Sequence, residues 1–390
     1  MARASGRAPL TPCRTVARGA RCGTALLVPE VSVQDIKLGT VPDNAAQDAT
    51  ARSLPWREGS ATGVGSMPDT DPARACAVIM DELPDFPFLP ELPARGVGAD
   101  MIGRAASLLI DLPVETTPRG WKFAAHPGRD QRAAASFLSF DLDAAQEAAE
   151  GYSGPYKVTV CGPLTLAARI ELSRSMNPAL ADPGALADLT NSLAEGVAAH
   201  VQEIRQRIPG ATVVVQLDEP DLPAVLAGRV PTASGLGMLA ALDQIVASAT
   251  LRSVLEAATA FTVLHCCAPN YPFLLAREVG AGAASFDLTL VGRAGIDGVA
   301  EIADAGLGLL VGAVPTTGDD SLRRPPRDTA SEVVTMWRHT SLDSRLLAQQ
   351  VVITPACGLA SLSPEAARAA LKGCREAARI APELIEEVAR

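Results

Sequence analysis

Long apolar runs and a dense cysteine framework are missing from this chain of 390 residues, and clustered positive charge is missing from its main body. No apolar run reaches the roughly 18 residues that a membrane-spanning helix needs, so no span is predicted. The eight cysteines do not follow the regular pattern of a small disulfide-rich secreted domain, and a cytoplasmic location fits best. A net charge of -10, with no basic patch in the main body, argues against nucleic acid and anionic membranes as partners.

The first 55 or so residues differ in composition from the rest. Met1 to Cys22 contains five arginines and no acidic residue, among Ala, Gly, Pro and Thr. An organelle-type targeting peptide and a disordered arm both fit this composition. We expect a disordered N-terminal extension over residues 1–55, followed by a single domain over residues 56–390.

From Ala61 onward, short apolar runs alternate with long helical stretches, which is typical of a parallel sheet with crossover helices. Eight such runs are predicted as strands: Ala61–Ser66, Phe86–Glu91, Lys157–Cys161, Thr212–Asp218, Phe261–Cys267, Ala283–Asp287, Leu307–Val314 and Gln350–Pro355. Eight parallel strands in a chain of this size indicate an α/β protein of the (β/α)8 TIM-barrel class. A doubly wound open sheet is the alternative, but no glycine-rich phosphate fingerprint follows the first strand.

Two of the connections carry signals of their own. Leu92 to Tyr156, after the second strand, is too long for a simple crossover and predicts an insertion over the barrel mouth. Pro183 to Arg207 has apolar residues at helical spacing and predicts one long helix, which ends before Pro209-Gly210.

A histidine and two cysteines end the fifth predicted strand. His265 and Cys267 share one face of an extended chain, whereas Cys266 takes the other. Imidazole and thiolate are ligands that suit Zn²⁺. The alternative is that both are ordinary buried strand residues, because free cysteine is among the most buried residue types.

A barrel brings all strand ends to one mouth, and two more metal-competent groups fall there. Asp287 ends the sixth strand, and Cys357 follows the eighth. We therefore predict a zinc site of His265, Cys267, Asp287 and Cys357. For Asp287 the alternative is a helix cap.

The first and fourth strands end in groups that fit an amino acid. Gln216 and Asp218 share a face, so a carboxylate that binds a substrate ammonium is one interpretation, and a helix cap is the other. The tight turn Gly63 to Pro68 offers backbone N–H groups and the Ser66 hydroxyl to a carboxylate. With a thiophilic metal, these features predict a pocket for an amino acid that carries a thiol.

The motifs together resemble the cobalamin-independent methionine synthases and their single-barrel relatives. The matching segments follow the family's order from Ala61 to the C-terminus: Gly65-Ser66-Met67-Pro68, Gly162-Pro163-Leu164-Thr165, Gln216-Leu217-Asp218-Glu219-Pro220, His265-x-Cys267 and Pro355-Ala356-Cys357-Gly358-Leu359. The resemblance implies a zinc enzyme that transfers a methyl group to the sulfur of homocysteine.

The resemblance also implies roles for individual residues. His265, Cys267 and Cys357 fall on the family's zinc ligands, and Asp287 stands where the family has a glutamate. Val64, Gly65, Ser66 and Asp218 fall on the homocysteine site. The family's second acid for the amino group is not clearly matched, and Asp100 is the candidate for it.

The chain departs from the family around the methyl donor. The family's proton-donor histidine after the seventh strand has no counterpart, so no catalytic residue is assigned beyond the metal site. The donor is therefore open between a folate and a methylated corrinoid or corrinoid protein. Two other functions remain: a metal-free barrel enzyme of the uroporphyrinogen decarboxylase type, using arginines such as Arg95 and Arg104, and a non-catalytic thiol- or zinc-binding homologue.

Overall fold

The computed structural model describes residues 53–317 and 324–389. The described residues all belong to one compact unit, Ala46–Arg390. The extension predicted over residues 1–55 lies almost entirely outside the described residues. No helix in the described part is both long and apolar enough to cross a membrane.

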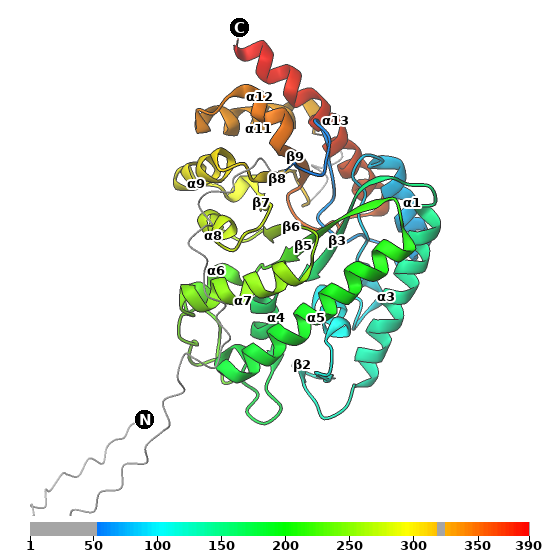
Figure 1. Ribbon diagram of the computed structural model, residues 1–390, viewed down its shortest axis with the longest axis vertical. Helices are drawn as coiled ribbons and strands as arrows, with labels where there is room; N and C mark the ends of the chain where they lie inside the picture. The colour runs from blue at the N-terminus through cyan, green and yellow to red at the C-terminus, as the bar shows by residue number, and fades with distance from the viewer. Residues whose placement is uncertain (1–52, 318–323, 390) are drawn as a thin grey trace, which may run out of the picture. The chain divides into compact units, whose positions relative to one another are not determined.

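This unit is built on a curled sheet of six parallel strands (Figure 1), hydrogen-bonded in the order β3-β5-β6-β7-β8-β9. The strands are β3 (Gly154–Cys161), β5 (Ala211–Asp218), β6 (Phe261–Cys266), β7 (Ala283–Asp287), β8 (Gly308–Val314) and β9 (Val351–Pro355). These correspond to the last six predicted strands, with ends that differ by up to three residues. The prediction of an α/β fold with a parallel sheet is confirmed.

The first two predicted strands are extended segments joined by single parallel bridges rather than by regular ladders. Ala61 bridges to Ile353 of β9, Ser66 to Glu91, and Phe88 to Lys157 of β3. Pro87 and Pro90 explain part of this difference, because proline has no N–H to donate to a ladder.

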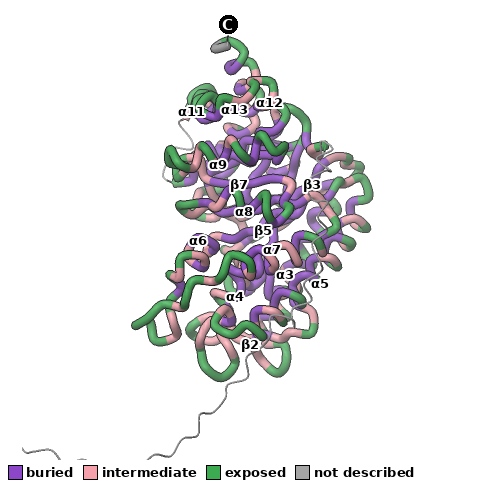
Figure 2. The backbone as a smooth tube through the Cα atoms, turned by 60° about the vertical axis from the view of Figure 1, so that its left-hand side comes forward, coloured by how far each residue is buried: buried purple, intermediate pink, exposed green. Residues whose placement is uncertain are grey.

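Helices follow most of the strands and cover the outer side of the sheet (Figure 2). They are α1 (Pro72–Glu82), α4 (Pro163–Arg169), α5 (Pro183–Arg207), α6 (Leu222–Leu226), α7 (Gln244–Ala257), α8 (Phe273–Glu278), α9 (Arg293–Asp304), α11 (Pro326–Thr340), α12 (Ser344–Gln350) and α13 (Pro364–Ala389). The long helix predicted over Pro183–Arg207 is confirmed as α5. Its N-cap is Asp182, whose carboxylate accepts from Ala185 N.

The long connection before β3 contains its own secondary structure. It comprises η2 (Pro93–Arg95), α2 (Met101–Leu108), β1 (Val114–Thr117), β2 (Gly120–Phe123) and α3 (Arg129–Ala148). Strands β1 and β2 form an antiparallel hairpin, and β2 pairs in parallel with β4 (Ile170–Glu171), a two-residue strand that follows α4. The hairpin is thereby joined to the connection that leaves the carboxyl end of β3.

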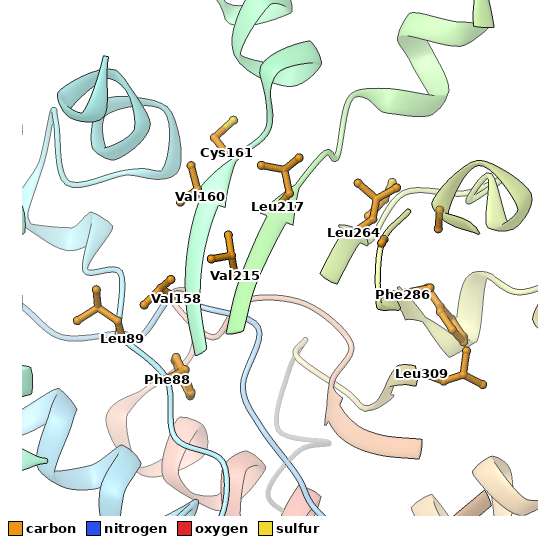
Figure 3. Close-up of a cluster of buried hydrophobic side chains, with 14 of the residues drawn as sticks. Phe88, Leu89, Val158, Val160, Cys161, Val215, Leu217, Leu264, Phe286 and Leu309 are labelled. Carbon is orange, nitrogen blue, oxygen red and sulfur yellow. The ribbon is translucent and has the colours of Figure 1, made fainter. Parts of the chain in front are cut away.

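Alternating residues of the sheet divide the core into two clusters. Figure 3 shows part of the larger one, in which Val158 and Val160 of β3 lie beside Val215 and Leu217 of β5. The smaller cluster lies on the other face, called the inner face here, and contains Trp56, Phe86, Val214, Val263, Ala283, Leu310 and Val352. Because these seven side chains from seven segments touch one another, the inner face is closed by apolar packing near the amino ends of the strands.

Candidate metal and substrate site

Polar residues lie directly above the apolar cluster on the inner face. Two positions further along their strands, Val214 gives way to Gln216, Val263 to His265 and Ala283 to Ser285. All three polar side chains are buried. Strand alternation keeps them on the inner face, so this face is polar toward the carboxyl ends of the strands and apolar toward the amino ends.

Two cysteines from separate strand ends meet at this edge. Cys267 follows β6, Cys357 follows β9, and their Sγ atoms are 3.4 Å apart. The hydrogen bond between the two sulfurs lowers the pKa of Cys357 to about 6, although burial opposes this. The same contact and burial raise the pKa of Cys267. At neutral pH the pair therefore holds a thiolate and a thiol, and a thiolate is the form that binds metals.

His265 lies two residues before Cys267, on the same face of the strand. Its Nδ1 is 2.8 Å from Ser285 Oγ on β7, and burial lowers its pKa to about 3. The imidazole is therefore neutral, as a metal ligand must be. Metal-binding histidines usually have their second ring nitrogen held by a hydrogen bond, and Ser285 makes such a bond here.

Asp287, the fourth predicted ligand, uses one carboxylate oxygen as a cap. Its Oδ1 accepts from Thr289 N at 2.8 Å and Thr289 Oγ1 at 2.7 Å, at the start of η4 (Leu288–Leu290). Across residues 53–317 and 324–389, no three His, Cys, Asp or Glu side chains converge as a metal site. The structure thus brings together the two sulfurs of the predicted set, and the soft donors present fit a thiophilic ion.

The predicted amino-acid end of the site is a connected hydrogen-bond network. Gln216 Nε2 donates to Asp218 Oδ1 at 2.7 Å and to Val64 O at 3.0 Å. Burial, followed by the nearby charge of Glu91, raises the pKa of Asp218. Asp218 and the Val64 carbonyl therefore accept hydrogen bonds from the same Gln216 amide, and their place in one substrate pocket stays a prediction.

The turn at Gly65 and Ser66 also touches the cysteine segment. Leu359 N donates to Ser66 O at 2.9 Å, and a Cβ built on Gly358 would lie 2.1 Å from Ser66 Oγ. A larger residue at position 358, directly after Cys357, would therefore require the Ser66 hydroxyl to rotate away. The Ser66 N–H is not bonded to any residue in the described part of the chain, which leaves it available to an acceptor.

Two residues of this pocket were missed by the sequence reasoning. Glu91 is buried and accepts from Thr159 Oγ1 at 3.2 Å, while burial raises its pKa. Lys157 is also buried and donates from Nζ to Val64 O and Gln216 Oε1, both at 2.8 Å. Burial lowers the pKa of Lys157 to about 7, against the opposing charges of Asp218 and Glu91. The sequence did contain a signal for both residues, because each is a charged residue within a segment predicted as a strand: Glu91 in Phe86–Glu91 and Lys157 in Lys157–Cys161.

Asp100, the candidate second acid, lies outside this network. Its Oδ1 accepts from Ile102 N and Gly103 N, both at 3.0 Å, so it is the N-cap of α2. Glu91 occupies the position next to the Ser66 turn instead, because the two segments are bridged there.

Comparisons with known proteins find similar solved structures and a matching family model. Among solved structures, a B12-independent methionine synthase from Shewanella sp. W3-18-1 is 15% identical, with 64% of this chain and 68% of that chain covered and a TM-score of 0.44. A protein from Anabaena variabilis, assigned by inference as a sugar phosphate isomerase or epimerase, is 11% identical, with 84% and 99% covered and a TM-score of 0.39. At these values neither similarity carries an argument. No curated protein matches the chain.

The family comparison is more extensive. The model of the cobalamin-independent synthase catalytic domain matches residues 177–380, which is more than half of the chain. That range includes Asp218, His265, Cys267, Asp287 and Cys357. The chain therefore belongs to the cobalamin-independent synthase catalytic-domain family.

Proposed function

We propose that this protein is a zinc-dependent methyltransferase that transfers a methyl group to the thiol of homocysteine. Family membership supports the reaction class. The observation that carries the proposal is the 3.4 Å approach of Cys267 and Cys357, two sulfurs that are distant in sequence. The proposal includes an eight-stranded (β/α)8 barrel in which the bridged segments around Ala61 and Phe88 complete the ring, with an insertion over its mouth.

His265, Cys267 and Cys357, with Asp287, would hold the zinc ion. A neutral imidazole held by Ser285 and an acidic Cys357 support this assignment. When bound, zinc supplies a Lewis acid that keeps a substrate thiol ionised at neutral pH.

The remaining residues of the pocket would hold homocysteine. The carboxylates of Asp218 and Glu91 would bind its ammonium, and the Ser66 N–H would donate to its carboxylate. These contacts would fix the sulfur relative to an incoming methyl group, which is how positioning lowers the barrier of a group transfer. The residues fit both an amino end and a sulfur end of one small substrate.

Two other functions were considered from the sequence. The decarboxylase-type alternative needs free arginines at the mouth, but Arg95 and Arg104 both pair with the buried carboxylate of Asp141, at 2.8 Å each. This arrangement does not favour it. A non-catalytic thiol- or zinc-binding homologue differs from the proposed enzyme only in turnover.

The test is the zinc content of protein purified without chelators, in wild type, Cys357→Ser, Cys267→Ser and the matched control Cys266→Ser. Cys266 is adjacent in sequence but lies in the outer core cluster. We expect about one zinc per chain in wild type and control and at least a tenfold weaker affinity in the two site variants. Absence of zinc from the wild type, or equal zinc in all four proteins, contradicts the metal site.

Turnover is measured on the zinc-loaded wild type with homocysteine. Methyltetrahydrofolate and methylcobalamin are offered as methyl donors in separate reactions, and methionine is detected by mass spectrometry. Methionine from either donor supports the enzyme and assigns the donor class. Zinc and homocysteine binding without methionine from either donor supports the non-catalytic homologue instead.

A further inference from the structure

Lys157 is a charged residue enclosed by the sheet. Its side chain is fully buried in the middle of β3, with Nζ 5.5 Å from the centroid of the Phe88 ring. A buried ammonium is costly unless it is paired and hydrogen-bonded. Its two close partners, Val64 O and Gln216 Oε1, both belong to the proposed homocysteine pocket.

The contact with Lys157 fixes the orientation of the Gln216 amide. In its protonated form Lys157 can only donate, and the Gln216 amide accordingly turns its oxygen toward Nζ. The amide nitrogen then points to Asp218 Oδ1 and Val64 O, to which it donates at 2.7 Å and 3.0 Å. A flipped amide would place an oxygen acceptor against the Asp218 carboxylate. Lys157 therefore controls, through Gln216, which group faces Asp218.

Lys157 also offsets part of the negative charge of the pocket. Asp218 and Glu91 are two buried carboxylates, and each of them interacts electrostatically with Lys157. With both carboxylates ionised, the three groups carry one net negative charge, and a single substrate ammonium would neutralise it. A buried charge cluster is tolerated when its charges are matched in this way.

We propose that Lys157 is a positioning residue for the ammonium end of the substrate, acting through the Val64 carbonyl and the Gln216–Asp218 hydrogen bond. The inference rests on the proposed function and adds to it the residue that arranges amino-acid recognition. Lys157 does not touch the reacting sulfur. Loss of the Lys157 side chain should therefore weaken the binding of thiols that carry an α-amino group and leave the binding of thiols that lack one unchanged.

The test compares two ligands by isothermal titration calorimetry on zinc-loaded protein. Homocysteine carries the α-amino group, and 4-mercaptobutanoate is the same thiol acid without it. We expect Lys157→Met to weaken homocysteine binding roughly 10- to 100-fold, the range for a lost hydrogen bond to a charged group, and to change 4-mercaptobutanoate less than about threefold. In turnover, KM for homocysteine should rise while kcat is largely retained.

Two further variants separate positioning from packing. Gln216→Met breaks the same chain of hydrogen bonds but leaves the lysine charge, and should give the same selective loss. It also provides the measurement if Lys157→Met does not fold. Val158→Ala removes buried methyl groups from the outer face of the same strand and should change neither affinity.

The outcomes are distinguishable from those of the proposed function. The positioning role alone is overturned if wild type binds both thiols and the affinities of Lys157→Met and Gln216→Met are either unchanged or lowered equally for both thiols. Wild type that binds neither thiol overturns the proposed function and the role of Lys157 together. The inference is supported if either variant loses affinity for homocysteine selectively and Val158→Ala does not.

Discussion

Glu91 and Asp218 come from different segments and are both buried. Burial and the charge of Glu91 raise the pKa of Asp218, so a cation between the two carboxylates would stabilise both of them. We expect Glu91→Gln to lower homocysteine affinity about tenfold, because a neutral amide loses the charge that would bind the ammonium. Affinity for 4-mercaptobutanoate should stay within about threefold. Calorimetry with the two ligands measures both values.

Glu82 provides the control for Glu91. It is buried to the same extent, and its carboxylate pairs with Arg368 and Arg375, outside the pocket. Glu82→Gln should lower the free energy of unfolding and leave both affinities unchanged. If Glu82→Gln lowers homocysteine affinity as much as Glu91→Gln does, the Glu91→Gln substitution acts through protein stability and not through substrate binding.

His200 is a buried histidine on α5 whose titration should appear in stability. Burial, with the nearby charge of Arg104, lowers its pKa to about 3. Below the unfolded-state value of about 6.5 the unfolded chain takes up a proton and the folded chain does not, so stability falls as pH falls toward 3. This site should contribute about 1.4 kcal/mol of lost stability per pH unit below about 6.

The measurement is denaturant unfolding from pH 7 to pH 4 in wild type, His200→Leu and His339→Gln. In His200→Leu the free energy of unfolding should decline less steeply with falling pH than in wild type, by about 1.4 kcal/mol per pH unit below about pH 6. His339 is exposed on α11, and its variant should run parallel to wild type. Parallel curves for wild type and His200→Leu would rule out a neutral buried imidazole at this position.

The direction of an individual site residue could be predicted where it lies on a regular strand. Strand alternation placed Cys267 inward and Cys266 outward, and the structure has Cys266 in the outer core and Cys267 against Cys357. Glu91 and Asp100 could not be ranked in this way. Whether an acid caps a helix or faces a pocket depends on where the following backbone turns, and that is set by tertiary packing.

At the scale of single elements, two glycines should respond oppositely to alanine. A Cβ on Gly308 of β8 would lie 2.4 Å from the Trp56 ring, whereas a Cβ on Gly373 of α13 would meet nothing within 4 Å. Gly308→Ala should lower the free energy of unfolding by about 1–3 kcal/mol through overpacking. Gly373→Ala should raise it by about 0.5–1 kcal/mol through helix propensity.

Thermal and denaturant unfolding of the two variants test this pair. Each variant serves as the other's control, because both add one methyl group to the same background. A destabilising Gly373→Ala would contradict the open position on α13. A neutral Gly308→Ala would contradict the tight packing of Trp56 on β8.

The positions of the strands were predicted more accurately than the hydrogen bonds between them. Six apolar runs formed regular strands at nearly the predicted bounds, because continuous β-branched sequences suit a sheet buried on both faces. The runs that begin at Ala61 and Phe86 formed bridges only. Their prolines and glycines were visible in the sequence, but composition alone did not indicate which N–H groups would lack partners.

For the whole molecule, the alternation of strands and helices was sufficient to predict a parallel α/β architecture. It was not sufficient to predict the contents of the long connection before β3. The β1–β2 hairpin pairs with β4, a strand of only two residues that no periodicity could reveal. Short elements of this kind are formed by their neighbours and not by local sequence preference.

The family match begins at residue 177, after the segments that contribute Val64, Ser66, Glu91 and Lys157. The proposed zinc ligands all lie between His265 and Cys357. In the proposed enzyme, recognition of the substrate's amino end would thus come largely from the first half of the chain and the metal ligands from the second, with Asp218 between them. A change of thiol substrate could therefore arise by exchanging early segments alone, while the later half retained its activating metal. Chimeras with related proteins, joined near residue 177, would exploit this division.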